Sequence, residues 1–440
     1  MKTFEKYKIV LLALLSAICY LILGYFTNRT DFVKLLLIVS ILFGVYFILI
    51  QKVQIQPYTL FILGIGFRLI LFGCTPFLSQ DFYRFIWDGR LMASGYSPFE
   101  YTPNQLISAT TMQQAQLLYK GMGSLSASHF SNYPPINQLL FALAGLLSTK
   151  SILGSILIFK TQIIVADIGI YVIGKRIMHL LSINSNTIFL YFLNPLVLIE
   201  LTGNLHFEGV MIFFFLLGIY FLLQKKLLFS ALFISISIST KLLPILLLPV
   251  FIQFIGWKKS ILFYLTILVV NGLLFLPFLS VHLINNYLDT ISLWFTNFEF
   301  NASFYYLVRE IGFYVKGYNI IGIVGKITPV LLLLFVGFVA FFKNNKTPHN
   351  LFLSFILVLS VYFFQATTVH PWYVINVVVL SCFTKFRFAM VWSFTVFLSY
   401  FAYSNVLFKE NLGLIFIEYS VVFGYLIFEL KYTETAIKIK

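Results

Sequence analysis

The chain has 440 residues, of which 60% are hydrophobic and 10% are charged, and its mean hydropathy is +0.94. Soluble domains carry about 25% charged residues, so this composition excludes a water-soluble globular protein and indicates one that lies in a lipid bilayer. The net charge of +15 does not indicate nucleic acid, because the basic residues lie mostly in short clusters between apolar runs.

Apolar runs of membrane-spanning length recur from end to end. The first follows Lys2, Lys6 and Lys8 like a signal peptide, but it lacks a small-residue cleavage site, so we expect a retained helix. The sequence predicts an all-α polytopic membrane protein, a single multi-helix domain over 1–440 with roughly 12–14 transmembrane helices. The candidate spans lie near 9–26, 33–50, 58–78, 153–173, 187–203, 208–224, 227–240, 241–256, 261–279, 320–342, 349–366, 371–384, 388–406 and 411–430.

Basic clusters indicate which side each connection faces. With both termini in the cytoplasm, nearly every cluster falls inside, as the positive-inside rule requires. These clusters are Lys52, Lys175 and Arg176, Lys225 and Lys226, Lys258 and Lys259, Lys343 and Lys346, Lys385 and Arg387, and the C-terminal tail. A span at 136–148 would break this pattern, so we expect a re-entrant or interfacial helix there. Two long loops with short helices, about 79–152 and 280–319, then lie outside a multi-pass protein of the cell (inner) membrane.

The first outside loop opens with a dense group of charges: Asp81, Arg84, Asp88 and Arg90. The first three are spaced i, i+3, i+7 and therefore share one face of a helix. One interpretation is a self-paired ionic cap at the membrane surface, which stabilises little. The other is a general base, because partial desolvation at the bilayer edge raises a carboxyl pKa toward a useful value.

The next polar segment contains Tyr133 and Gln138 around the pair Pro134-Pro135. The prolines alone predict a simple turn from a loop into the short helix that follows. The side chains of Tyr133 and Gln138 could also line a wet cleft of the size of a sugar.

Carboxylates and a histidine gather at the next outer boundary. Asn194-Pro195 interrupts a span, and Glu200, His206 and Glu208 follow. Ionisable groups at such a depth are costly unless they pair or face water, which favours a functional site, although a simple His206–Glu208 pair is the alternative. His-x-Glu supplies too few ligands for a metal site, and we expect no metal and no cofactor.

Two further outer positions carry polar side chains. Lys241 either extends to the interface or pairs with a fixed anion, for which a phosphate is the obvious candidate. It breaks the positive-inside pattern, which favours the second reading. His370, Trp372 and Tyr373 lie in the last tight outside connection, where interfacial aromatics are common but can also contact a sugar ring.

The order of several motifs resembles the GT-C superfamily. These motifs are the string from Asp81 to Arg90, the Gly95–Phe99 and Tyr133–Gln138 segments, Asn194-Pro195, Gly203-Asn204-x-His206, Lys241 with Pro244, and His370-Pro371-Trp372. More narrowly, the chain resembles bacterial polyprenyl-phosphate-mannose-dependent mannosyltransferases over about 58–405. The resemblance implies a GT-C-like bundle, a lipid-phosphate sugar donor, catalysis on the non-cytoplasmic face, and Asp81 as the catalytic base. More than one span before the catalytic loop, and Glu208 in place of an Asn-Asp pair, depart from that pattern.

These features together predict a glycosyltransferase that moves a hexose, with mannose favoured, from a polyprenyl-phosphate donor to a glycan or lipid acceptor with inversion. Asp81 is the expected catalytic residue. The expected substrate-binding residues are Arg84, Asp88, Arg90, Tyr133, Gln138, His206, Glu208, Lys241, His370, Trp372 and Tyr373. The alternative is a secondary transporter or lipid flippase, which the one-sided polar clusters and the absence of a sequence repeat disfavour. A scaffold without chemistry is a third option.

Overall fold

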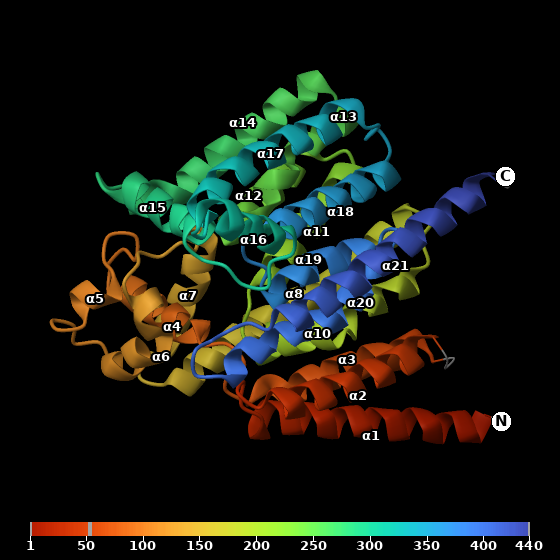
Figure 1. Cartoon of the computed structure of the whole chain (residues 1–440), viewed down its shortest axis with the longest axis horizontal. Helices are drawn as coiled ribbons and strands as arrows, with labels where there is room; N and C mark the ends of the chain where they lie inside the picture. Colours follow the sequence, from red (N-terminus) through yellow and green to blue (C-terminus); the bar gives the residue numbers. More distant parts are fainter. Residues whose placement is uncertain (1, 52–54, 439–440) are drawn as a thin grey trace.

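The structure is a computed structural model that describes residues 2–51 and 55–438, so Lys52 lies outside the described residues. Within these ranges helices are the only regular elements apart from one isolated bridge, between Phe300 and Thr368. Figure 1 shows them in chain order. They are α1 (Lys2–Phe26), α2 (Phe32–Gln51), α3 (Pro57–Phe72), α4 (Asp81–Ala93), α5 (Pro103–Leu106), α6 (Ala115–Ala127), α7 (Pro135–Leu147), α8 (Ile152–Leu180), η1 (Ser185–Ile188), α9 (Phe189–Phe192), α10 (Pro195–Val197), η2 (Leu198–Gly203), α11 (Glu208–Leu223), α12 (Leu227–Thr240), η3 (Leu243–Val250), α13 (Phe251–Ile255), α14 (Trp257–Phe275), η4 (Leu276–Phe278), α15 (Leu283–Thr296), α16 (Phe304–Lys316), α17 (Ile321–Phe342), α18 (Pro348–Gln365), α19 (Pro371–Ser381), α20 (Phe388–Thr395), η5 (Val396–Ser404) and α21 (Leu412–Lys438).

The chain is an all-α polytopic membrane protein. Among the described residues, seven helices are long and apolar enough to cross a membrane: α1, α2, α8, α14 with η4, α17, α18 and α21. The pair Ser185–Phe192 and Pro195–Gly203, bent by 51°, makes an eighth if it forms one span. The other predicted spans fall on apolar helices of 10–17 residues, so length alone assigns seven or eight of the expected 12–14 spans. The difference arises because an apolar run in sequence does not show where a helix breaks.

Proline and asparagine cause the break that matters most for the site. Pro195 cannot donate a backbone hydrogen bond, and the Asn194 side chain accepts one from the backbone N–H of Leu196, which starts α10 in a new direction. The π-helix η2 follows and ends at Gly203. This irregular segment places Glu200, Asn204 and His206 in the interior, where each is at most 2% exposed.

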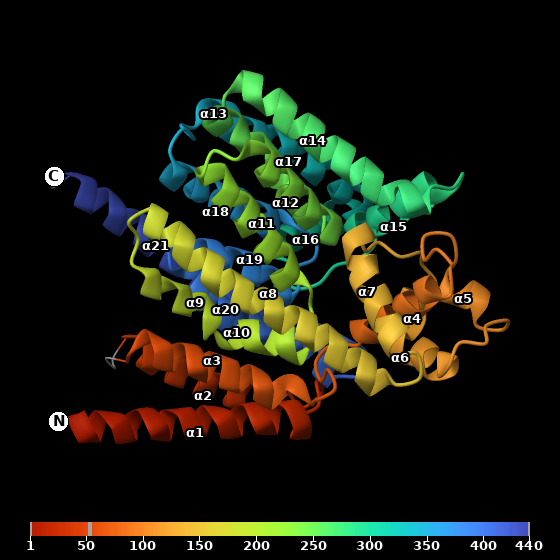
Figure 2. The same ribbon diagram turned by 180° about the vertical axis from the view of Figure 1, so that it is seen from behind.

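The helices α4 to α7 form a lobe at one end of the molecule, whereas both chain termini lie at the opposite end (Figures 1 and 2). Within the lobe α4 packs closely on α7, and the approach is set by two glycines. A Cβ on Gly89 would lie 2.1 Å from the Phe141 carbonyl oxygen, and one on Gly145 would lie 2.2 Å from the carbonyl oxygen of Gly89. The apolar segment expected at 136–148 is therefore the helix on which α4 rests.

A buried ion pair joins three helices within the bundle. Arg68 in α3 donates from Nε to Asp167 in α8 at 2.9 Å, and Tyr191 in α9 donates to the other carboxylate oxygen at 2.6 Å. Arg68 also donates to the carbonyl oxygens of Gly64 and Phe192. Buried charges in a membrane protein require such partners, and these fix α3 and α8, from which the site segments extend.

Candidate active site

Asp81 is the first residue of α4, and it follows the apolar α3 after a short connection. Its backbone N–H donates to Ser79 Oγ at 3.2 Å, while its carboxylate accepts no hydrogen bond from any described residue. Burial raises the pKa of Asp81 to about 6, nearby Lys241 and Arg29 lower it, and Glu208 raises it. A free carboxylate with a pKa near neutrality can accept a proton from a substrate.

Lys241 and Glu208 form an ion pair beside Asp81. Lys241 follows the last residue of α12 and Glu208 begins α11, so the packing of these two helices brings the charges together. The lysine side chain is 22% exposed, and that of the glutamate is 2% exposed. Glu208 Oε2 is buried and has no hydrogen-bond partner among the described residues. The ammonium group is therefore the accessible partner of the pair.

The segment after η2 connects to the loop that precedes Asp81. Asn204 Oδ1 accepts hydrogen bonds from the backbone N–H groups of Phe77 and Leu78, at 3.3 and 3.0 Å. The Asn204 side chain donates to Glu200 at 3.2 Å, and the Tyr400 hydroxyl donates to the same carboxylate at 2.5 Å. Asn204, which is held by Glu200, therefore fixes the loop that precedes Asp81.

The rings of His206, Trp372 and His370 form a stack. The His206 and His370 rings lie 3.6 and 4.4 Å from the Trp372 ring, with interplanar angles of 18° and 10°. These distances leave room for one imidazole on each indole face, so neither face of Trp372 is open to a sugar. Tyr373 contacts His370 edge-on at 5.4 Å.

Both imidazoles in this stack are neutral. Burial lowers the pKa of His370 to about 3, with a further contribution from Lys241. Burial also lowers the pKa of His206 well below its usual range, and Lys241 and His370 add to the effect. His206 Nε2 and His370 Nδ1 are buried without a hydrogen-bond partner among the described residues. Each can donate to or accept from a substrate hydroxyl, depending on its tautomer.

The remaining predicted residues hold the lobe together. Arg84 donates from Nε to Asp88 at 2.7 Å, and Gln138 donates to Asp88 and to Ser131 Oγ. Arg84 also donates to the carbonyl oxygens of Ser126 in α6 and of His129, and Arg90 donates to the carbonyl oxygen of Gln113 and the side chain of Gln114. These side chains are engaged within the fold.

Tyr133 lies between this lobe and the site. Its ring contacts Phe85 and Phe141 edge-on. Burial and the Asp81 carboxylate raise its pKa well above the usual range, so the hydroxyl is a neutral donor near Asp81. The structure thus brings Tyr133, Glu208 and Lys241 near Asp81 and His206 and His370 near Lys241. It places Arg84, Asp88, Arg90 and Gln138 within the lobe.

Sequence reasoning missed Arg29. This residue lies between α1 and α2, and its charge acts on Asp81. The sequence contains the same signal for Arg29 as for Lys241: each is a cation in a connection that is predicted to be outside, against the positive-inside rule.

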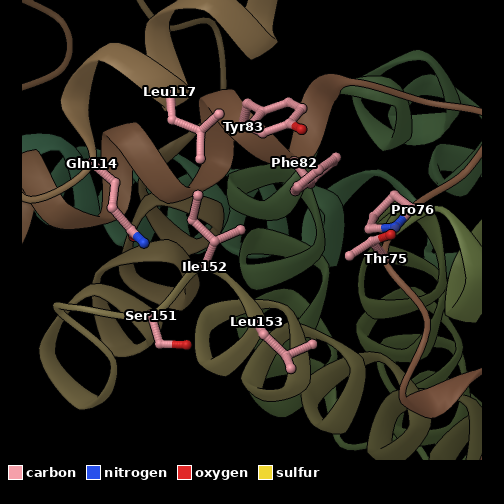
Figure 3. Close-up of a pocket in the computed structure, with 9 residues that line it drawn as sticks. All are labelled: Thr75, Pro76, Phe82, Tyr83, Gln114, Leu117, Ser151, Ile152 and Leu153. Carbon is pink, nitrogen blue, oxygen red and sulfur yellow. The ribbon is translucent and has the colours of Figure 1, made fainter.

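A cavity of about 440 Å³ lies beside α4, as Figure 3 shows. Phe82 and Tyr83 line it, but Asp81 and Lys241 do not, so it opens on another face of the helix. Its remaining lining comes from the segments around Thr75, Gln114 and Ser151. No group of three or more His, Cys, Asp or Glu side chains in the described chain is arranged to hold a metal ion.

Comparison with known proteins gives one match. Residues 29–257, just over half of the chain, match the family model described as alpha-(1->6)-mannopyranosyltransferase, N-terminal domain. This range contains Asp81, Tyr133, His206, Glu208 and Lys241 and ends before His370. No curated protein and no solved structure matches.

Proposed function

The chain belongs to the alpha-(1->6)-mannopyranosyltransferase family, and from this we propose that it moves mannose from a polyprenyl-phosphate donor to a hydroxyl of a glycan or lipid acceptor. The family is one of transferases, which disfavours the transporter alternative. The observation that supports this chemistry best is Asp81: a carboxylate without a hydrogen-bond partner among the described residues, with a pKa raised to about 6 and two cations nearby.

In the proposed reaction Asp81 is the general base. It accepts the proton of the acceptor hydroxyl as that oxygen attacks the anomeric carbon of the donor. The bond from this carbon to the phosphate oxygen breaks on the opposite face, the electron pair leaves with the polyprenyl phosphate, and the configuration inverts. Lys241 stabilises the negative charge that develops on the leaving phosphate. We assign this role to Lys241 because its side chain is partly exposed beside Asp81, whereas Arg84 and Arg90 are buried and donate to groups of the lobe.

The polar atoms around Asp81 favour a polyol ligand. His206 Nε2, His370 Nδ1 and Glu208 Oε2 are buried and make no hydrogen bond within the described chain, and His206 Nε2 lies 3.6 Å from Glu200 Oε2. Leaving such atoms unpaired is costly, and proteins rarely do so without a reason. Sugar hydroxyls both donate and accept hydrogen bonds, and can therefore satisfy two neutral imidazoles and a carboxylate together.

The donor class can be tested with the purified protein in nanodiscs. We expect mannose transfer from polyprenyl-phosphate mannose and none from a nucleotide-activated mannose, because a lipid donor reaches a site at the end of membrane helices laterally. Product formation is measured by mass spectrometry for both donors at equal concentration. Equal or preferred use of the nucleotide donor would contradict the proposal.

We also propose that the site faces the outside and that both termini are cytoplasmic. The opposite placement of the termini and the α4–α7 lobe supports this topology (Figures 1 and 2). The native cysteines Cys19, Cys74 and Cys382 are buried, so labelling by an impermeant maleimide has a low background. In intact cells Tyr101→Cys in the lobe should react, whereas Lys226→Cys in the α11–α12 connection should react only after permeabilisation. The reverse pattern would overturn the topology.

A further inference from the structure

The connection between α1 and α2 contacts the start of α4. Arg29 Nη2 donates to Gln80 Oε1 at 3.1 Å, and Gln80 Nε2 donates in turn to the carbonyl oxygen of Met122 at 3.1 Å. Gln80 is the residue immediately before Asp81 and precedes the first turn of α4. The orientation of Asp81 therefore depends on a side chain that is held by Arg29 on one side and by α6 on the other.

The guanidinium group of Arg29 is itself fixed by aromatic rings. Its central carbon lies 5.1 Å from the Tyr403 ring and 6.0 Å from the Phe408 ring. Arginine over an aromatic face gains electrostatic stabilisation and loses little geometric freedom. The Tyr403 ring contacts Phe300, which in turn lies 5.1 Å from His370. Arg29 is thus part of the wall that surrounds the proposed site.

The charges of the two cations near Asp81 are balanced differently. Lys241 forms an ion pair with Glu208, whereas Arg29 forms no ion pair with any carboxylate of the described chain. The other titratable groups facing Asp81 are Glu200 and the phenols of Tyr133, Tyr373, Tyr400 and Tyr403. None of these supplies positive charge. Arg29 is therefore the cation near Asp81 whose charge is not offset by a paired carboxylate.

We propose that Arg29 is a positioning residue for Asp81, which fixes the start of α4 through Gln80 and keeps the carboxylate ionised. This inference rests on the proposed role of Asp81 as the base. The pKa of Asp81, raised by burial and lowered by Arg29 and Lys241, agrees with it. Loss of the Arg29 charge would raise that pKa further, so a larger fraction of the base would be protonated at a given acidic pH.

The test is the pH dependence of kcat/KM for the purified full-length protein in nanodiscs, with polyprenyl-phosphate mannose as donor. For the wild-type protein we expect activity to fall below a pH near 6. Arg29→Met should shift this acid limb upward by about half a pH unit or more and lower kcat at neutral pH about tenfold, with the donor KM within about twofold. Arg29→Lys, which keeps the charge, should return the limb toward its wild-type position.

The matched control is Lys34→Met on the same helical hairpin. Lys34 donates to the carbonyl oxygen of Phe26 at the end of α1, and it is not among the charges that shift the pKa of Asp81. We expect a wild-type pH profile for this variant. If Arg29→Met does not fold, Arg29→Gln replaces it, because its amide can donate to Gln80 without carrying a positive charge and should give the same upward shift.

Two results overturn the inference about Arg29. One is an unshifted acid limb in a folded Arg29→Met or Arg29→Gln protein. The other is a raised donor KM without any shift, which would make Arg29 a phosphate ligand instead. In both cases the inactivity of Asp81→Asn would leave the proposed function standing. Full activity of Asp81→Asn would instead remove the base itself, so the two failures can be distinguished.

Discussion

Replacing Asp81 by Asn should lower kcat for mannose transfer about 100-fold or more, because the amide keeps the shape of the side chain but cannot accept the proton. Binding of the donor should survive, since the proposed contact with the phosphate belongs to Lys241. The two quantities are measured separately, as single-turnover transfer and as equilibrium binding of polyprenyl-phosphate mannose. A folded Asp81→Asn protein with wild-type kcat would exclude the carboxylate mechanism.

Asp88 provides the comparison, because it is the other carboxylate on the same helix. It is fully buried and bonded to Arg84 and Gln138. We expect Asp88→Asn to act on stability, because it leaves the buried guanidinium of Arg84 without its counter-ion. Its midpoint of thermal unfolding should fall, whereas that of Asp81→Asn should not. Loss of kcat in a stable Asp88→Asn protein, with full kcat in Asp81→Asn, would transfer the role of base to Asp88.

The sequence predicted the class of fold because membrane helices are encoded locally. Long apolar stretches require no tertiary information, and α1, α2, α8, α17 and α18 lie where those stretches occur. Breaks within apolar runs were harder to place. Pro244 and Pro249 turn one expected span into the short elements η3 and α13, and α19 ends after 11 residues.

Local spacing also predicted one contact of the lobe. Arg84 and Asp88 are one turn apart, and their side chains meet at 2.7 Å. Contacts between helices distant in sequence were not predictable from spacing. The partner of Lys241 was expected to be a phosphate, and the structure shows Glu208 from the preceding helix. The stack of His206 on Trp372 joins segments that are more than 150 residues apart in the printed sequence.

The same limit explains why Arg29 was missed. Its importance comes from the contact between the first helical hairpin and Gln80, and no pattern within 27–31 indicates which loop that hairpin touches. Both Arg29 and Lys241 are, however, cations in connections expected outside. The cations that lower the pKa of Asp81 are these two, and not Arg84 or Arg90 of the charge-rich helix α4.

Lys241→Ala should reduce both stability and binding of the donor. The substitution leaves the Glu208 carboxylate buried without its counter-ion, and removing one partner of a buried pair costs roughly 3–5 kcal/mol in the free energy of unfolding. The partial exposure of Lys241 places the expected loss near the lower end of this range. Binding of polyprenyl-phosphate mannose should weaken about tenfold or more, because a charge-assisted contact to the phosphate is lost.

The double variant Lys241→Met with Glu208→Gln separates these two effects. It removes both charges together, so no unpaired carboxylate remains and the midpoint of thermal unfolding should return most of the way to the wild-type value. Donor binding should stay weak, since neither new side chain carries positive charge. If binding also recovers, Lys241 acts only by neutralising Glu208, and the phosphate must be held by another cation. If Lys241→Ala binds the donor normally while it is destabilised, the same conclusion follows from the single variant.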